Sequence, residues 1–425
     1  MRSWRYMARG GRSPSGKLVM MHDSTSRHRH RQFHLPLGWT TLLALVLALI
    51  ATACRGRLPD KGQVAVGPGE PLVIGVITAL SGPLAAEGEG IAQAARLAAE
   101  ERATVLGHPV RLAVRDGGCE PAAAEASVGA LLEEPGLVGI VGPVCSPACV
   151  AVEPLLFQRA VVMVTPRCTD IAVTRQGYEG ILRTAYTDAL QAVALGKLAD
   201  NVLHVHRVFL VHDGTIYGRG LRDVVKLVLG EGRLLGNVEV APGSEDYGPA
   251  VRSIAGSGAG LVFYAGYPED AARFVAQVRA AGLTVPVVLP DAAFVPPGFT
   301  TAAGAAAEGV YITETVPQPG AGYSAFAERY RNRFGTAPGP FAAEAYDAVH
   351  LLLDAVERAA EHHGERLAID RRRLRDAARH TDRAGASGRV RFLPHGDRVE
   401  GAAVRLWQVR DGRPVPVQLI DVSEK

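Results

Sequence analysis

Continuous apolar runs of strand length recur along the chain and alternate with segments of helical periodicity. The first run is Leu72–Leu80, and a Ser-Gly-Pro turn and a stretch of helical periodicity at 91–103 follow it. Strands that are covered on both faces of a parallel sheet read as solid apolar runs. Runs of the same character lie at 110–116, 137–141, 161–164, 207–214, 260–266 and 285–291. This pattern predicts an α/β fold with parallel sheets between layers of helices.

The strand and helix units fall into two series, which predicts two doubly wound, Rossmann-like lobes joined by a hinge of several chain crossings. The first series ends near Leu182–Asp188, and a second crossing is expected near Gly309–Thr315. The expected lobes are residues 72–185 with 314–388, and residues 186–313 with 389–425. Helices are predicted at 323–334 and 341–360, and a hairpin around Gly396-Asp397 within 390–417. Two such lobes would hold a ligand between them.

The amino terminus carries the features of an export signal. The basic stretch Arg27–Arg31 precedes an apolar run at Leu42–Ala51, and small residues lead to Cys54. A basic region, a short apolar core and a small-residue cleavage site are typical of a secretory signal peptide, here residues 1–53. A transmembrane anchor is the alternative, but the run is short for the roughly 30 Å of hydrocarbon in a bilayer. A start at Met20 or Met21 would give a signal of more ordinary length.

The segment that ends at Cys54, Ala-Thr-Ala-Cys, resembles a bacterial lipobox, although Ala51 replaces the usual leucine. The resemblance implies that Cys54 is lipidated and becomes the first residue of a protein anchored to a bacterial membrane, in the periplasm or on the cell surface. Residues 54–71 are rich in Gly, Pro and charge, so we expect a tether between the membrane and the fold.

Composition and charge narrow the class of protein. The 425 residues exceed a typical single domain, and the net charge of +3 comes from acids and bases that are interspersed along the globular part. This balance gives no indication of nucleic-acid binding. Besides Cys54 there are four cysteines, an even number that favours disulfides in an oxidising compartment, with buried thiols as the alternative. Their spacing is not that of a zinc ribbon, and we expect neither a metal nor a cofactor.

Two hydroxyl residues follow apolar runs, Ser146 after 137–141 and Thr169 after 161–164. Open α/β sheets bind small ligands beyond the carboxyl ends of their strands, so both residues are candidates for a ligand site. Ser146 also suits the cap of a helix that starts at Pro147, and Thr169 suits a turn.

An ordered set of motifs resembles the leucine/isoleucine/valine-binding proteins, the type I periplasmic solute-binding proteins of branched-chain amino acid ABC importers. The resemblance covers Leu72 to about Val417 and starts with IGVITALSGPLAAEGEGIAQAARLA. The other motifs, in chain order, are GIVGPVCSPA, VTPRCTDIAVTRQGY, LRTAYTD, VHDGTIYGRG, FYAGYPED, LPD, AAEGVYIT, RFGTAPGPFAAEAYDAV and FLPHGD. This resemblance implies a two-lobed protein that binds an amino acid and delivers it to an ABC permease.

The resemblance also implies a set of ligand-binding residues. Ser146 and Thr169 match hydroxyls that bind the α-carboxylate and help to hold the α-ammonium group of the ligand. Asp291 takes the place of a glutamate that pairs with the ammonium, and Tyr217 and Tyr267 match aromatic contacts. A zwitterion that leaves water needs partners for both charges, because an unpaired buried charge costs several kcal/mol. Hydroxyls and a single acid are residue types that meet this need.

Further positions follow from the same resemblance. Val144 and Cys145 would offer backbone groups to the ligand. Cys119 and Cys145 match the family's disulfide, which would also fix the turn before the candidate serine. Cys149 and Cys168 remain as a second pair.

Two departures from the family bear on the ligand. Glu87 stands where relatives often have a tyrosine that lines the side-chain pocket, and Arg167 replaces a small residue. A charged pair would suit a polar side chain or an amide better than leucine. The alternative is that Arg167 offers only its backbone carbonyl and points its guanidinium to solvent, the usual place of an arginine.

Two other functions fit parts of the sequence. A sensory ectodomain or accessory subunit would bind an amide or a polar amino acid in the same cleft and report it to a partner. An enzyme would need a nucleophile with a base, and no such spacing occurs around His212 and Asp213. Gly88 and Gly90 lack the third glycine of a dinucleotide-binding loop. The sequence therefore favours a binding protein over an enzyme.

Overall fold

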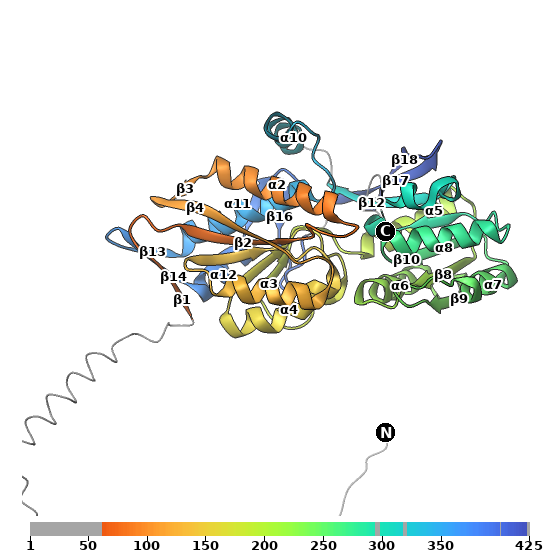
Figure 1. The fold of residues 1–425 in the computed structure, drawn as a ribbon, viewed down its shortest axis with the longest axis horizontal. Coiled ribbons are helices and arrows are strands. Elements are labelled where there is room, and N and C mark those ends of the chain that lie inside the picture. Colours follow the sequence, from red (N-terminus) through yellow and green to blue (C-terminus); the bar gives the residue numbers. More distant parts are fainter. Residues whose placement is uncertain (1–61, 294–297, 318–320, 400, 423–425) are drawn as a thin grey trace, which may run out of the picture. The chain divides into compact units, whose positions relative to one another are not determined.

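The computed structural model describes residues 62–422 except 294–297, 318–320 and 400 (Figure 1). The predicted signal peptide, Cys54 and the part of the predicted tether up to residue 61 lie outside the described residues. Within those described ranges, no helix combines the length and the apolar character that crossing a membrane requires. The described chain forms two large sheets, each covered by helices, and two small sheets.

The first large sheet has six strands in the order β3-β4-β2-β5-β6-β7, and only the pair of β3 and β4 is antiparallel. Its strands are β2 (Leu72–Thr78), β3 (Thr104–Val105), β4 (His108–Asp116), β5 (Leu137–Val141), β6 (Val162–Thr165) and β7 (Ile181–Arg183). The helices on its faces are α2 (Ala85–Glu101), α3 (Pro121–Leu132), α4 (Ser146–Arg159) and α11 (Ala342–Ala359). Because α2 and α11 pack on one face and α3 and α4 on the other, every residue of β2 and β5 is buried (Figure 1).

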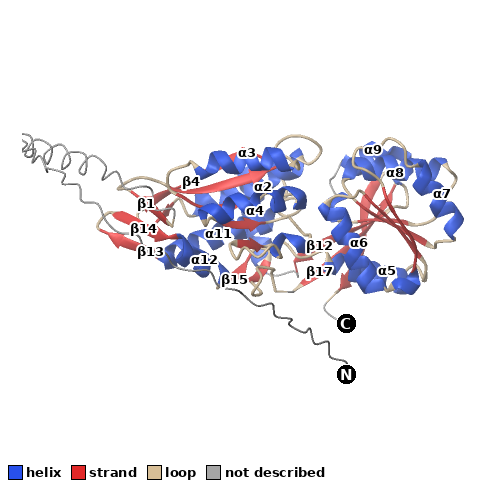
Figure 2. Cartoon of the chain, turned by 90° about the horizontal axis from the view of Figure 1, so that it is seen from below, coloured by secondary structure: helices blue, strands red, loops and turns tan. Residues whose placement is uncertain are grey.

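The second large sheet has seven strands in the order β18-β17-β12-β11-β10-β8-β9. Its strands are β8 (Val208–His212), β9 (Leu234–Glu239), β10 (Leu261–Ala265), β11 (Val287–Leu289), β12 (Tyr311–Pro317), β17 (Ala402–Arg410) and β18 (Arg413–Asp421). The helices around it are α5 (Ala189–Asn201), α6 (Ile216–Leu229), α7 (Gly248–Ser257), α8 (Pro268–Ala280) and α9 (Gly298–Ala303). Figure 2 shows α5 and α6 on one face and α7, α8 and α9 on the other, and each face has its own hydrophobic core.

The chain passes between the two sheets three times. The crossings lie between β7 and α5, between β12 and α10 (Ala321–Phe334), and between β16 (Gly388–Arg391) and β17. The first two fall near the predicted crossings. The predicted boundaries at 314 and 389, however, divide β12 and β16, and Val390 belongs to the core of the first sheet.

One of the two small sheets corrects a further prediction. A three-stranded sheet joins β1 (Gln63–Val66), β14 (Arg366–Asp370) and β13 (Ala360–His363), and a two-stranded sheet pairs β15 (Asp382–Gly385) with β16. Helix α12 (Arg371–Arg379) and four 3₁₀ helices at 171–174, 231–233, 291–293 and 304–307 complete the described elements. The tether was predicted to reach residue 71, but Val64 and Val66 of β1 are buried in the core.

The carboxyl-terminal hairpin was predicted around Gly396-Asp397, and this position is wrong. The long hairpin of β17 and β18 turns at Asp411-Gly412. The prediction of a carboxyl-terminal hairpin is therefore correct, but its position is not. Gly396-Asp397 lies in a separate turn, which is closed by a single bridge between Phe392 and Arg398.

Candidate ligand-binding site

Ser146 is the first residue of α4, at the carboxyl end of β5, and it is 2% exposed. Cys145 occupies the cap position, and the Ser146 side chain makes no capping bond. Its hydroxyl instead accepts a hydrogen bond from the backbone N–H of Asp170 at 3.3 Å. The alternative prediction of a helix-capping serine is therefore wrong. The two turns that follow β5 and β6 are joined through this hydroxyl.

Thr169 lies in the second turn and is also buried. Its carbonyl accepts a hydrogen bond from the backbone N–H of Asp188 at 3.0 Å, and its side chain bonds to the Asp188 carboxylate. The turn leads into a 3₁₀ helix that Asp170 caps by accepting from the N–H of Ala172 at 2.7 Å. Thr169 thus combines a place in a turn with a hydroxyl on the site.

Asp291 opens a 3₁₀ helix after β11 and is 4% exposed. Tyr217 donates a hydrogen bond to its Oδ1 at 3.2 Å, and Thr315 donates to its Oδ2 at 3.4 Å. Burial raises the pKa of Asp291, while the Arg167 charge opposes that rise. The rings of Tyr217 and Tyr267 lie 5.4 Å apart, so the second predicted tyrosine packs on the one that contacts Asp291.

Arg167 is buried, with its side chain 5% exposed, and the prediction that its guanidinium points to solvent is wrong. Its Nε donates to the carboxylate of Glu87, and its Nη1 donates to the carbonyl of Val144 at 2.8 Å. The guanidinium also lies 5.5 Å from the ring centre of Phe341. Burial disfavours its charge, but Glu87, followed by Tyr267, more than offsets this, so the pKa of Arg167 is raised.

Two aspartates and one glutamine contact the candidate residues, although the sequence reasoning did not select them. Gln191 of α5 donates to Asp188 Oδ1 at 3.0 Å, and its own Oε1 accepts from the backbone N–H of Asp291 at 3.0 Å. Burial, together with repulsion from Asp291 and Asp170, raises the pKa of Asp188. Burial likewise raises the pKa of Asp170 to about 6. The signal was available, since Asp170 directly follows Thr169 and Asp188 ends the LRTAYTD motif.

Three of the predicted site residues, Ser146, Thr169 and Asp291, belong to one network. A hydrogen bond joins Ser146 to Asp170, the next residue after Thr169, and further hydrogen bonds join Thr169 to Asp188 and, through Gln191, to Asp291. In the part of the chain that the structure describes, no cluster of three or more His, Cys, Asp or Glu residues is suited to hold a metal ion. The arrangement offers two hydroxyls at one end, the Asp291 carboxylate at the other, and buried aspartates between them.

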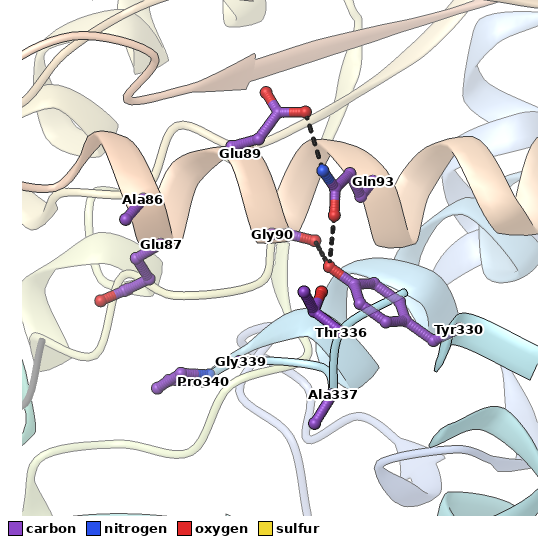
Figure 3. Close-up of a pocket in the computed structure, with 10 residues that line it drawn as sticks. All are labelled: Ala86, Glu87, Glu89, Gly90, Gln93, Tyr330, Thr336, Ala337, Gly339 and Pro340. Atoms are coloured by element: carbon purple, nitrogen blue, oxygen red, sulfur yellow. Dashed lines mark hydrogen bonds between the residues drawn. The ribbon is translucent and has the colours of Figure 1, made fainter. Parts of the chain in front are cut away.

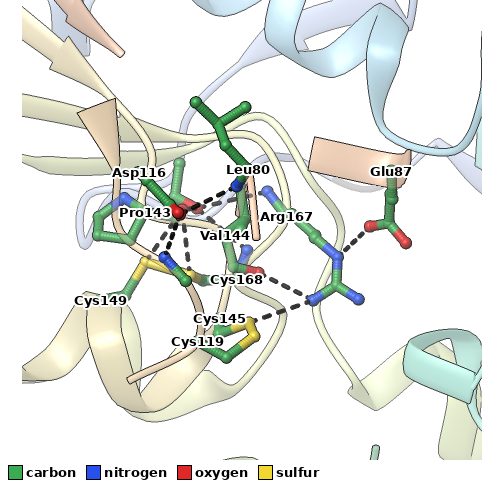
Figure 4. The surroundings of a disulfide bond; sticks show 12 residues. Leu80, Glu87, Asp116, Cys119, Pro143, Val144, Cys145, Cys149, Arg167 and Cys168 are labelled. Atoms are coloured by element: carbon green, nitrogen blue, oxygen red, sulfur yellow. Dashed lines mark hydrogen bonds and ion pairs between the residues drawn. A yellow bond between two sulfur atoms is a disulfide. The ribbon is translucent and has the colours of Figure 1, made fainter. Parts of the chain in front are cut away.

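All four cysteines near the site are paired in the structure (Figure 4). Cys119 joins Cys145 next to Ser146, and Cys149 of α4 joins Cys168 next to Thr169. Each pair therefore links to one of the two turns that carry the candidate hydroxyls.

Three cavities border the site without enclosing it. One of about 390 Å³ lies beside Glu87, between α2 and the segment at 336–340 (Figure 3). A second of about 180 Å³ touches Thr315 and Phe341. The third, of about 490 Å³, is lined by Tyr267 together with the amino-terminal ends of α4 and α6, and its surface is mostly apolar.

Two α/β lobes with hydroxyl and acidic residues at their strand ends define a two-lobed binding protein, and the comparison with family models agrees. Residues 71–413 match the family of periplasmic binding proteins, so the chain belongs to that family. The resemblance and the fold class predicted from the sequence are confirmed. The family is one of solute-binding proteins rather than enzymes.

Several relatives carry more specific names. The chain is 31% identical to an amino acid binding protein from Pseudomonas aeruginosa over 55% of this chain, and the match spans 64% of that relative's length. It is 28% identical to Leu/Ile/Val-binding protein homolog 3 from Brucella melitensis over 68% of this chain and 79% of the relative. Among solved structures, a leucine-binding protein from Thermotoga maritima matches with a TM-score of 0.74 and 27% identity, covering 82% of this chain and 99% of that one.

Proposed function

We propose that the protein is an extracytoplasmic solute-binding protein of an ABC importer, which binds an amino acid of the branched-chain type or a related one between its two lobes. The observation that carries the proposal is the network from Ser146 to Asp291, which spans both sheets and ends in hydroxyls on one side and a carboxylate on the other. The names of the Pseudomonas and Brucella relatives support an amino acid as ligand.

Each end of the network suits one charge of an amino acid. Ser146, Thr169 and the free N–H groups at the start of α4 would bind the α-carboxylate, because a helix amino terminus favours an anion. Asp291 would pair with the α-ammonium, and Tyr217 and Tyr267 would form the wall around it. A bound ammonium would also reduce the repulsion among the buried carboxylates, since it adds positive charge beside them.

The cellular setting belongs to the same proposal. Residues 1–53 would be removed as a signal peptide, Cys54 would carry the lipid anchor, and both disulfides would form after export into an oxidising compartment. The ligand-loaded protein would then dock on the permease of its transporter. A ligand held by residues of both lobes would stabilise their closed arrangement, and that arrangement would be the one that docks.

Isothermal titration of residues 59–425 against the common amino acids, simple amides and urea tests the proposal. These residues form one compact unit that contains both sheets. We expect at least one amino acid to bind with a Kd on the order of 1 μM, or about 8 kcal/mol. If no amino acid gives a heat of binding, the proposed function is wrong.

A further inference from the structure

We infer that the preferred ligand carries a side chain that ends in a planar group with both a hydrogen-bond donor and an acceptor, such as a carboxamide or ureido group, bound by Arg167 and Glu87. The inference rests on the proposed function, because it places this group next to the site for the amino acid's charged end. It names the chemistry of the side chain, which the network from Ser146 to Asp291 does not determine.

The observation is a pair of unsatisfied polar atoms of opposite kind. Arg167 uses Nε for Glu87 and Nη1 for Val144, but its Nη2 has no hydrogen-bond partner in the described part of the structure. Glu87 uses Oε1 for Arg167, and its Oε2 has no partner either. The two side chains are only 5% and 3% exposed, so solvent satisfies neither atom. Figure 4 shows the guanidinium and the carboxylate facing each other, with one donor and one acceptor left over.

The position of the pair places it within the ligand site. Tyr267 and Asp291 both act on the charge of Arg167, and Asp291 also acts on the charge of Glu87. The carbonyl of Val144, which holds the guanidinium, lies two residues before Ser146. A ligand whose ammonium meets Asp291 and whose carboxylate meets Ser146 would therefore direct its side chain towards the pair.

The chemistry of the two free atoms discriminates among side chains. An aliphatic side chain would leave both atoms unsatisfied and would seal them further from water. A carboxylate would satisfy Arg167 but repel Glu87, and an ammonium would do the reverse. A carboxamide accepts from Nη2 through its oxygen and donates to Oε2 through its nitrogen, without adding net charge to a neutral pair.

Titration calorimetry with residues 59–425 tests the inference through a set of unbranched ligands: glutamine, citrulline, glutamate, lysine and norleucine. Glutamine or citrulline should bind at least about 100-fold tighter than norleucine, because sites built for hydrogen bonds reject analogues that lack the matching group. Tighter binding of norleucine or leucine would overturn the inference while leaving the proposed function intact. Tighter binding of glutamate or lysine would overturn it as well, and the absence of binding to any amino acid would overturn both.

A paired substitution separates recognition from a structural role of the ion pair. Arg167→Met with Glu87→Met removes both charges together, which avoids leaving one charge buried alone. The preference for glutamine over norleucine should fall below about 10-fold in this variant. The matched control replaces the exposed pair Arg333 and Glu100 with methionine and should leave the preference unchanged. A paired variant that still prefers glutamine about 100-fold would overturn the inference, and if it does not fold, the ligand series on the unchanged protein decides.

Discussion

A guanidinium stays charged inside a protein only where neighbouring groups balance it, and Arg167 meets this condition through Glu87, 80 residues away in the sequence. Arginines are usually exposed, and this general tendency led to the wrong expectation that the Arg167 guanidinium points to solvent. Whether a charge can be buried depends on partners that only the fold brings near. The motif-based reasoning did identify both residues as departures from the family. It could not decide whether they meet.

The candidate hydroxyl and acid make a direct prediction about affinity. Ser146→Ala and Asp291→Ala should each weaken binding of the preferred amino acid by roughly 1–3 kcal/mol, since each removes a buried partner of a ligand charge. Titration calorimetry of the two variants measures this loss. Ser253→Ala, which alters an exposed hydroxyl, is the control. Unchanged affinity in both Ser146→Ala and Asp291→Ala would contradict the site.

Glu153 predicts a dependence of stability on pH. It lies on α4, is 3% exposed, and neither carboxylate oxygen has a hydrogen-bond partner in the described structure. Burial raises the pKa of Glu153 from 4.5 to about 8, although Arg183 acts in the opposite direction. The folded state therefore holds this proton more tightly than the unfolded state does. Its contribution to stability is complete below pH 4.5 and is lost as the pH rises to about 8.

The measurement is a difference between the protein and its Glu153→Gln variant, because glutamine has no charge to lose. Chemical denaturation at several pH values should show the free energy of unfolding falling relative to the variant by about 1.4 kcal/mol for each pH unit within that window. Above it the difference should be constant. Parallel curves for the two proteins from pH 4.5 to 8 would show that the pKa of Glu153 is not raised.

Helix α2 is held against strand β2 at a position where only glycine fits. A Cβ atom on Gly88 would lie 1.8 Å from the carbonyl oxygen of Ala79, and the Gly88 carbonyl accepts a hydrogen bond from Thr78 at 3.0 Å. Gly88→Ala should therefore lower the free energy of unfolding by roughly 1–3 kcal/mol, because backbone must move to admit the methyl group. It should also weaken ligand binding, since Glu87 precedes it on the same turn.

Gly129 of α3 gives the matched control. It is exposed, and a Cβ atom there would meet no atom within 4 Å. Gly129→Ala should raise the free energy of unfolding by about 0.5–1 kcal/mol through helix propensity alone. Urea denaturation of both variants gives the two values. A loss of stability in both, or in neither, would contradict the close approach of α2 to β2.

The elements that could be predicted from the sequence are those buried on both faces. The runs at β2, β5, β8 and β10 are largely apolar because helices cover these strands on both faces. Such short apolar runs indicate a buried strand of a parallel sheet and few other structures. The strands that escaped prediction are short or half exposed, such as β9 at the edge of its sheet. Strand β1 has only four residues, Gln-Val-Ala-Val, and its alternation of exposed and buried positions is seen only in the fold.

The way in which the chain connects the two sheets could be predicted only in part from the sequence. Crossings near β7 and β12 follow from the order of apolar runs, but the exact ends of the lobes depend on strand pairs between distant segments. Strand β12 pairs with β17, about 90 residues later, and no local pattern encodes that partner. The third crossing was expected at residues 388–389, but it lies later, between β16 and β17, for the same reason.

The disulfides are distributed unevenly over the two lobes, and this asymmetry predicts how reduction changes the unfolding of each lobe. Both disulfides lie among residues that pack with the first sheet, and the second sheet has none. Each bond should contribute about 2–4 kcal/mol by restricting the unfolded chain. Reduction should therefore destabilise the first lobe and leave the second lobe with its own two cores.

Trp407 allows the two lobes to be followed separately. It is the only tryptophan in residues 59–425, and it lies in β17 of the second sheet, where its Nε1 donates to Glu314 at 2.9 Å. In oxidised protein we expect its fluorescence and the far-ultraviolet circular dichroism to change at similar urea concentrations. With reductant, circular dichroism should begin to fall at lower urea, while the fluorescence transition lags behind because the lobe that contains Trp407 has lost no disulfide.

The variant Cys149→Ala with Cys168→Ala should show a smaller separation of the same sign. Transitions that move together under reductant would mean that the lobes unfold as one unit, and transitions that do not move would mean that the disulfides contribute nothing to stability.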